Sequence, residues 1–369
     1  MATIASPGPA NIQPAASQTL GMAADVPRVV KATTTDYWFT LWGSLAGSFA
    51  LTWLLFHILP FSGDVGFFIC WYVVYLAMFA SVTAVKHSRL IVVDRLWMAI
   101  VTGAAVLTGV ALASTVWYTA QRGWSALHHP NFITQSASAA NLNGSLNHGG
   151  ILNAIVGSLI ELGIATVVAL PLGIITAVYM VEVGGRFSRV VKTVVEAMTA
   201  LPDILAGLFI YTTLIVGLGV QKSGFAAAMA MTVMMIPIIA RAADVALRVV
   251  PGGLREASLA LGAPQWRTVW RVVLPTASPG LGQAVILGMA RAVGETAPVF
   301  ITSGFSTFMN VNPLVNPMNS LPLYIFTAIR SGEPLFIERG FAAGIVLLAI
   351  VFILFGIARF VSRPRVARR

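Results

Sequence analysis

The sequence has few charged residues for its length. Asp, Glu, Lys and Arg make up 10% of the 369 residues, whereas soluble domains carry about 25%. Hydrophobic residues make up 57%, above the roughly 45–50% of soluble domains. A soluble globular protein is therefore excluded. The surplus of apolar residues must face lipid, and the sequence predicts an all-α polytopic membrane protein.

Cysteine is nearly absent, because Cys70 is the only one in the chain. This excludes an internal disulfide and a cysteine-based metal site. The five histidines show no metal-ligand spacing, so we assign no metal and no cofactor. The sequence also contains no Gly-rich phosphate-binding loop ending in Lys-Ser/Thr. We therefore expect no catalytic residue and no ATP hydrolysis by this chain itself.

Long apolar runs dominate the rest of the sequence. Residues 1–35 are rich in Ala, Pro, Ser and Gln, a composition that predicts a disordered tail. Eight stretches that follow are long enough to cross a bilayer. They are about 38–60, 65–85, 96–118, 151–181, 198–219, 224–242, 280–302 and 340–360.

Basic residues are distributed unevenly between the two sides of this eight-span topology. With the N-terminus inside, 18 Lys and Arg fall on the inner side and four on the outer side. Cytoplasmic loops carry such an excess, so we expect a multi-pass protein of the cytoplasmic membrane with both termini in the cytoplasm. The net charge of +10 follows from this topology. The basic C-terminal tail, 363–369, is then expected to meet anionic membrane lipid and not nucleic acid.

The segment 251–275 lies between the sixth and seventh expected spans and reads as two short helices. Leu254–Leu261 predicts the first helix, and Gly262 is placed to end it in a left-handed conformation. Pro264 suits the first turn of a second helix. We expect Leu274-Pro275 to end that second helix. Together they predict a compact projection on the cytoplasmic side.

The order of residues in this segment resembles a known loop. Glu256-Ala257-Ser258, then Gly262, then Leu274-Pro275 is similar to the EAA loop of bacterial ABC-importer permeases, except that Ala is usual at the position of Ser258. The resemblance implies that this loop forms the coupling helix that sits in a groove of a separate ATP-binding cassette ATPase subunit.

Other segments resemble the PstA-type phosphate permeases within that class. Ala290–Pro298 and Met235–Arg241 match two of that family's segments, and Leu201–Tyr211 matches a third except for Asp203, where Ser is usual. The resemblance implies the transmembrane domain of a type I ABC importer, with a six-helix core at 91–362 and an additional N-terminal hairpin at 36–90. It also implies phosphate import with a second permease subunit and an extracytoplasmic phosphate-binding protein.

Three charged residues fall in or at the ends of expected spans, where charge is costly and usually functional. They are Arg241, Arg291 and Glu295. Arginine donors match the oxygens of an oxyanion, so these residues are candidates for a substrate pathway. Arg291 and Glu295 are also four apart on an expected helix, so a purely structural ion pair is the alternative. Glu161, inside the fourth span, is equally compatible with a structural and a functional role.

Two other functions stay open at this stage. The first is a permease for another oxyanion, such as sulfate, molybdate or phosphonate. The second is a secondary transporter without an ATPase, which the spacing of the EAA-like segment disfavours.

Overall fold

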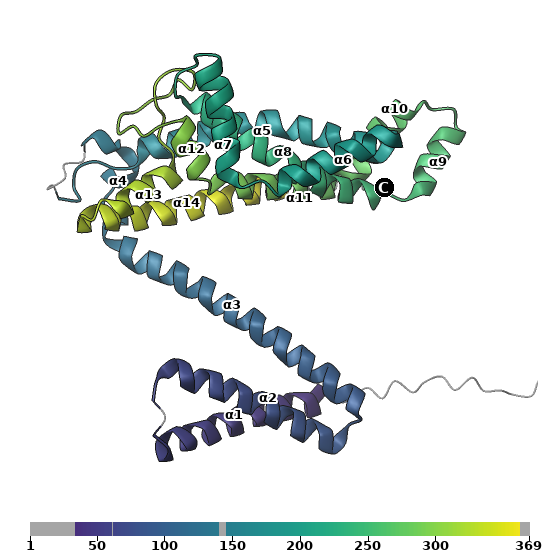
Figure 1. Cartoon of the computed structure of the whole chain (residues 1–369), viewed down its shortest axis with the longest axis vertical. Helices are drawn as coiled ribbons and strands as arrows, with labels where there is room; N and C mark the ends of the chain where they lie inside the picture. The colour runs from purple at the N-terminus through teal and green to yellow at the C-terminus, as the bar shows by residue number, and fades with distance from the viewer. Residues whose placement is uncertain (1–33, 61, 140–144, 362–369) are drawn as a thin grey trace, which may run out of the picture. The chain divides into compact units, whose positions relative to one another are not determined.

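The computed structural model describes residues 34–60, 62–139 and 145–361, and in these ranges all regular structure is helical (Figure 1). The expected all-α fold is confirmed. The chain divides into two compact units, 1–110 and 111–369. The expected C-terminal tail and residues 1–33 of the expected N-terminal tail lie outside the described ranges, while residues 34 and 35 already belong to the first helix.

The first unit consists of α1 (Thr34–Ile58), α2 (Asp64–Lys86) and the start of α3 (Arg89–Leu127). Its core is small and aromatic: Tyr75 and Phe79 are buried and stack on one another. The edge of the Tyr37 ring in α1 meets Phe79. The guanidinium of Arg95 lies 5.5 Å from the centre of the Tyr37 ring. These contacts join all three helices within the unit.

Polar groups and glycines bring these helices close together. The Trp71 indole N–H donates to the Ser48 hydroxyl at 3.1 Å, which satisfies both groups between α1 and α2. A Cβ added at Gly47 would lie 2.6 Å from the Met78 methyl group. Small residues at such crossings allow the close packing that holds helices together in a membrane.

The second unit is built around four long helices, α5, α8, α11 and α14, together with the end of α3 (Figure 1). Its elements are α4 (Asn131–Thr134), η1 (Ala137–Ala139), α5 (Leu152–Val178), η2 (Tyr179–Val183), α6 (Gly185–Thr199), α7 (Asp203–Ile210), η3 (Tyr211–Gly217), α8 (Gly224–Arg248), α9 (Gly252–Ala260), α10 (Gln265–Thr268), η4 (Val269–Val273), α11 (Leu274–Val293), α12 (Ala297–Thr302), α13 (Leu321–Arg330) and α14 (Pro334–Val361). The short helices α9 and α10 lie at one end of this unit, and α4 and α13 lie toward the other (Figure 1).

Helix α8 is the centre of this unit. Its Met235 and Ile239 side chains are fully buried against α5 and α11. The packing is close because both neighbours present glycine: a Cβ at Gly173 or at Gly288 would lie under 3 Å from the Ile239 side chain. The backbone of α5 and that of α11 therefore approach one branched side chain from two sides.

Seven of the described helical segments are long and apolar enough to span a membrane. They correspond to seven of the eight expected spans. The expected span at 198–219 is not one continuous helix. In its place, α6 and the segment Asp203–Gly217 meet at an angle of 104°. Pro202 lies at this bend. It interrupts the helix because proline has no N–H to donate and disfavours helical geometry in the preceding residue.

The expected span at 280–302 is wrong at both of its ends. Helical structure begins at Gln265 and continues to Val293, so Leu274-Pro275 does not end the second short helix as predicted. Pro275 lies in the first turn of α11, where a missing N–H is tolerated, and the π-helical turn Val269–Val273 comes directly before it. Beyond Val293 the chain breaks before α12 begins at Ala297.

Candidate functional site

The loop 251–275 forms two helices joined at Gly262. The Gly262 backbone has a φ of +78°, and its N–H donates to the carbonyl oxygen of Leu259 at 2.9 Å. The next N–H, of Ala263, donates to the carbonyl oxygen of Ser258 at 3.2 Å. Such bonds satisfy carbonyl groups at a helix end when the residue after it is left-handed. The predicted stop at Gly262 is confirmed.

This loop carries large apolar side chains that are exposed. Leu261, Trp266 and Trp270 expose 89%, 66% and 70% of their surface. Glu256 and Ala257 are exposed beside them on α9, while Leu274 is half-buried and Pro275 exposed at the start of α11. Exposed apolar patches bordered by polar residues are typical of protein interfaces. The geometry therefore suits docking of another protein.

Ser258 differs from the usual alanine of the EAA loop, and its hydroxyl has a partner. The Oγ atom of Ser258 lies 2.9 Å from Oγ1 of Thr268, a buried residue of α10. This hydrogen bond joins the two helices of the loop. The substitution therefore adds a polar link between α9 and α10 that alanine would lack.

Arg291 lies in the last turn of α11 between two carboxylates. It forms an ion pair with Asp203 at the start of α7, and its Nε lies 3.5 Å from Oε1 of Glu295. The expected pairing of Arg291 and Glu295 is therefore present. However, Glu295 lies beyond the end of the helix, after Gly294, and not on it.

Asp203 departs from the resembled family in sequence, and its pairing with Arg291 was not predicted from the sequence. The signal was available, since an acid near a membrane boundary needs a basic partner. The two residues are 88 positions apart, and only the bend at Pro202 brings them together.

A cavity of about 630 Å³ lies between the bend, α8 and α11. We call it the α7 cavity. Arg291 and Asp203 are its charged lining residues, and Thr199, Phe209, Met234 and Pro237 contribute other parts of the wall. Arg241 reaches its edge, because Nη1 of Arg241 donates to Oγ1 of Thr199 at 3.4 Å. The structure thus places Arg291 in the wall of this cavity, whereas Arg241 is bound to a wall residue and does not line the cavity itself.

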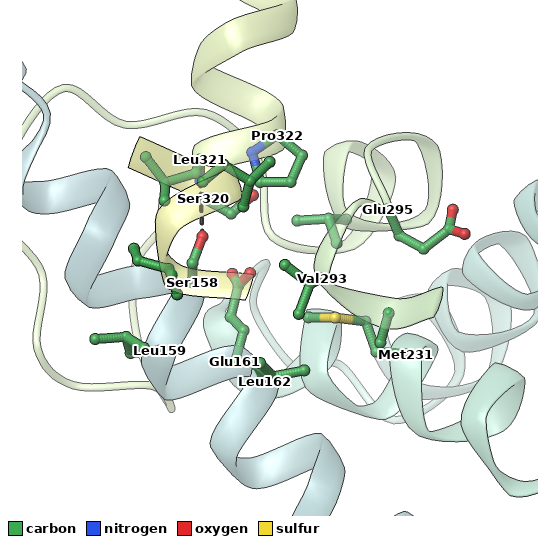
Figure 2. A pocket seen from close by; sticks show the side chains of 14 residues that line it. Ser158, Leu159, Glu161, Leu162, Met231, Val293, Glu295, Ser320, Leu321 and Pro322 are labelled. Atoms are coloured by element: carbon green, nitrogen blue, oxygen red, sulfur yellow. Dashed lines mark hydrogen bonds between the residues drawn. The ribbon is translucent and has the colours of Figure 1, made fainter. Parts of the chain in front are cut away.

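Glu295 is also one of the residues that line a second, much smaller cavity. This Glu161 cavity holds about 20 Å³, enough for one water molecule. Figure 2 shows Glu161 directed toward Ser320 and Leu321, whereas the Glu295 carboxylate points away from Glu161. Glu161 is fully buried, and its Oε1 accepts a hydrogen bond from the Ser303 hydroxyl at 3.0 Å. Its Oε2 has no hydrogen-bond partner among the described residues.

The opposite end of α5 carries an acid that the sequence analysis missed. Glu182 forms an ion pair with Arg255 of α9, with 2.9 Å between Oε1 and Nη2. No spacing rule connects the two residues, because 73 positions separate them. The α9–α10 loop is thus tied to the end of α5.

Several known proteins are similar to this chain in sequence. The chain is 40% identical over 250 residues to the phosphate transport system permease protein PstA 1 of Mycobacterium tuberculosis, covering 67% of this chain and 81% of that protein. It is 42% identical over 221 residues to the phosphate transport system permease protein PstA of Mycobacterium leprae, covering 59% and 73%. For the permease PstA of Haemophilus influenzae the identity is 35% over 198 residues, covering 53% and 68%.

The fold is also found in a solved structure. A chain of the bacterial alginate ABC transporter, crystallised with an alginate-bound periplasmic protein, matches with a TM-score of 0.54 at 15% identity, covering 73% of this chain and 94% of that one. At this identity the likeness shows the fold alone, the transmembrane domain of an ABC importer. Residues 169–368 match the family described as the inner membrane component of binding-protein-dependent transport systems. The chain therefore belongs to this family of ABC-importer permeases.

Proposed function

We propose that this chain is the permease subunit of an ATP-driven importer that carries inorganic phosphate across the cytoplasmic membrane. The observation that carries the proposal is the 40% identity, over 250 residues, to a permease named for phosphate transport. The cavity geometry supports it, because a half-exposed arginine side chain lines a space large enough for an oxyanion.

Arg291 is suited to recognise phosphate oxygens. A guanidinium group presents several N–H donors in one plane and can give two of them to one oxyanion. Phosphate entering the α7 cavity would accept these bonds from Arg291 in place of the Asp203 carboxylate. Arg241 would add a second positive charge at the edge of the cavity. Glu295 would hold the Arg291 side chain by its Nε while the other donors exchange partners.

The α9–α10 loop is the site that we assign to the ATPase. Glu256, Ala257, Ser258 and Gly262 form the docking helix and its stop, and Leu274-Pro275 lead from the loop into α11. ATP hydrolysis in the separate subunit would move this loop and open the pathway to alternate sides. The family's dependence on a binding protein supports an extracytoplasmic phosphate-binding protein as the supplier. A second permease subunit would complete the pathway, and membrane lipids cover the outer helix faces.

The chain is a multi-pass inner membrane protein, and we propose that both of its termini are cytoplasmic. Counting the bent pair α6 and α7 as one crossing gives eight spans, which returns the C-terminus to the side of the N-terminus. The excess of Lys and Arg then falls on the cytoplasmic side. Within this topology we assign 36–90 to the additional hairpin and 91–362 to the permease domain.

The uptake of radiolabelled phosphate by cells expressing the complete importer tests this function. Arg291→Gln should abolish uptake while the ATPase still co-purifies, and Arg291→Lys should restore it only in part, because a point charge does not reproduce the planar donors. Arg248→Gln is the matched control, since Arg248 pairs with Asp244 on the exposed face of α8. Excess unlabelled sulfate or molybdate should not compete. Competition by sulfate or molybdate would show that the importer carries another oxyanion and not phosphate.

A purely structural role for Arg291 gives a different result. Removing Arg291 alone would then leave Asp203 and Glu295 without their partner and lower assembly. The combined variant Arg291→Gln, Asp203→Asn, Glu295→Gln would recover both assembly and uptake. Normal phosphate uptake by this triple variant would refute the pathway role.

A further inference from the structure

A single glutamate connects both helices of the α9–α10 loop to the end of α5. The carboxylate of Glu182 accepts two hydrogen bonds from Arg255 of α9, from Nε at 3.0 Å and from Nη2 at 2.9 Å. The backbone oxygen of the same residue accepts one from the Gln265 side chain of α10 at 2.5 Å. Glu182 lies in the π-helical turn Tyr179–Val183 that continues α5.

Arg255 extends this contact to α8. Its Nη2 donates to the carbonyl oxygen of Leu247, and its Nη1 donates to that of Val250, both at 2.8 Å. Leu247 belongs to the last turn of α8, and Val250 lies two residues beyond its end, where backbone carbonyl groups often lack a helical donor. One guanidinium therefore binds the end of α8 and the end of α5 from α9.

The position of α9 depends strongly on this contact. None of the residues of α9 is buried, so apolar packing contributes little to its placement. The other side-chain hydrogen bond that the structure shows for α9 joins the hydroxyls of Ser258 and Thr268, and it is internal to the loop. The Glu182 and Arg255 side chains are 9% and 22% exposed, so water weakens their attraction less than at an open surface.

Helix α5 reaches from this contact to the opposite end of the unit. Its 27 residues correspond to a length of about 40 Å. Near its start, Asn153 donates to the backbone oxygen of Ser306, and Ser158 accepts from the backbone N–H of Leu321 at 2.7 Å (Figure 2). Glu161, one turn further, is bound to Ser303. The helix that meets the loop at Glu182 thus also holds the segment 303–321.

We propose that Glu182 is a positioning residue that transmits movement of the α9–α10 loop to α5, and through α5 to the segment 303–321. The inference rests on the proposed ATP-driven import. It deepens that function, because it names the residue through which the ATPase acts on the helix that binds the opposite loop.

The test uses the complete importer, with its ATPase and binding protein, reconstituted in liposomes. Phosphate taken up per ATP hydrolysed is measured for Glu182→Gln and for the control Glu196→Gln, which changes an exposed glutamate on α6. Glu182→Gln should lower this ratio about tenfold, the factor expected for one lost charge-assisted hydrogen bond. The control should leave the ratio unchanged.

A merely structural role predicts less assembled complex with an unchanged ratio, and that result overturns the proposal. If the complex with Glu182→Gln does not assemble, the ratio of phosphate taken up to ATP hydrolysed is measured for Glu182→Asp instead. It keeps the charge but is one methylene shorter, so it should assemble and give a reduced ratio. A ratio equal to that of the unmodified importer would overturn the proposal. The proposed phosphate import is tested separately with the unmodified importer. If phosphate is not the substrate, the ATPase of the unmodified importer responds to another oxyanion and not to phosphate.

Discussion

Replacing Asp203 by asparagine should strengthen phosphate binding in the α7 cavity. Arg291 carries one positive charge and lies between two carboxylates, Asp203 and Glu295, so the cluster has a net charge of about −1 when both acids are ionised. An entering phosphate must therefore compete with Asp203 for the guanidinium donors and also bear its repulsion. Asparagine keeps the size of the side chain and removes the charge.

The size of this effect follows from Coulomb's law. An oxyanion bound to Arg291 would lie about 6 Å from the Asp203 carboxylate, where two unit charges repel by about 2.8 kcal/mol at an effective dielectric constant of 20 and by about 0.7 kcal/mol in water. Asp203 is 34% exposed, so the expected value lies between these limits. The dissociation constant of phosphate should fall by a factor of about 3 to 100.

Equilibrium binding of radiolabelled phosphate to the purified complex, without ATP or binding protein, measures this constant. Asp244→Asn is the control, because it removes an acid from the pair with Arg248 on another face of α8. An unchanged or higher dissociation constant for Asp203→Asn would refute the idea that Asp203 competes with the substrate. If Asp244→Asn raises phosphate affinity equally, the effect comes from the change in net charge alone and not from the position of Asp203.

Three further results are expected from other parts of the chain. Gly262→Val should leave the protein in the membrane but lower phosphate uptake and ATPase attachment, because a residue with a Cβ in the left-handed conformation costs about 1–2 kcal/mol. Full phosphate uptake by this variant would refute the coupling role of the loop. Glu161→Gln should keep assembly, since an amide can still accept from the Ser303 hydroxyl, whereas Glu161→Leu should reduce the yield of complex because it removes one hydrogen bond between α5 and Ser303 and leaves the hydroxyl only the Met318 backbone oxygen, at a cost of about 1 kcal/mol. Equal yields would contradict this. In a variant in which Cys70 is replaced, Ser138→Cys should react with an impermeant thiol reagent added outside, and Arg267→Cys should not. The reverse labelling pattern would show that the proposed topology is inverted.

The positions of the helices could be predicted from hydropathy because each long apolar run is a local signal. Seven expected spans appear as long helices, and the stop at Gly262 was visible because only glycine takes a φ near +78° without strain. The interruptions were harder to predict. Pro202 lies near the start of the expected span 198–219 and Pro275 just before the expected span 280–302, yet the chain bends sharply at the first and continues as a helix through the second.

The charged contacts could be predicted only in part. Arg291 and Glu295 are neighbours in sequence, so their pairing follows from spacing alone. The partners Asp203 of Arg291 and Glu182 of Arg255 lie 88 and 73 positions away. Such pairs depend on how helices cross, which a single sequence does not encode as a local pattern.

The contacts of the first unit have a consequence for how the protein is made. The bonds that join α1, α2 and the start of α3, from Ser48 with Trp71 to Arg95 with Tyr37, all lie within the first 110 residues. Synthesis proceeds from the N-terminus, and compact units generally fold as they emerge. This hairpin can therefore finish packing in the bilayer while the ribosome is still translating α5. It enters the membrane before any part of the α7 cavity exists.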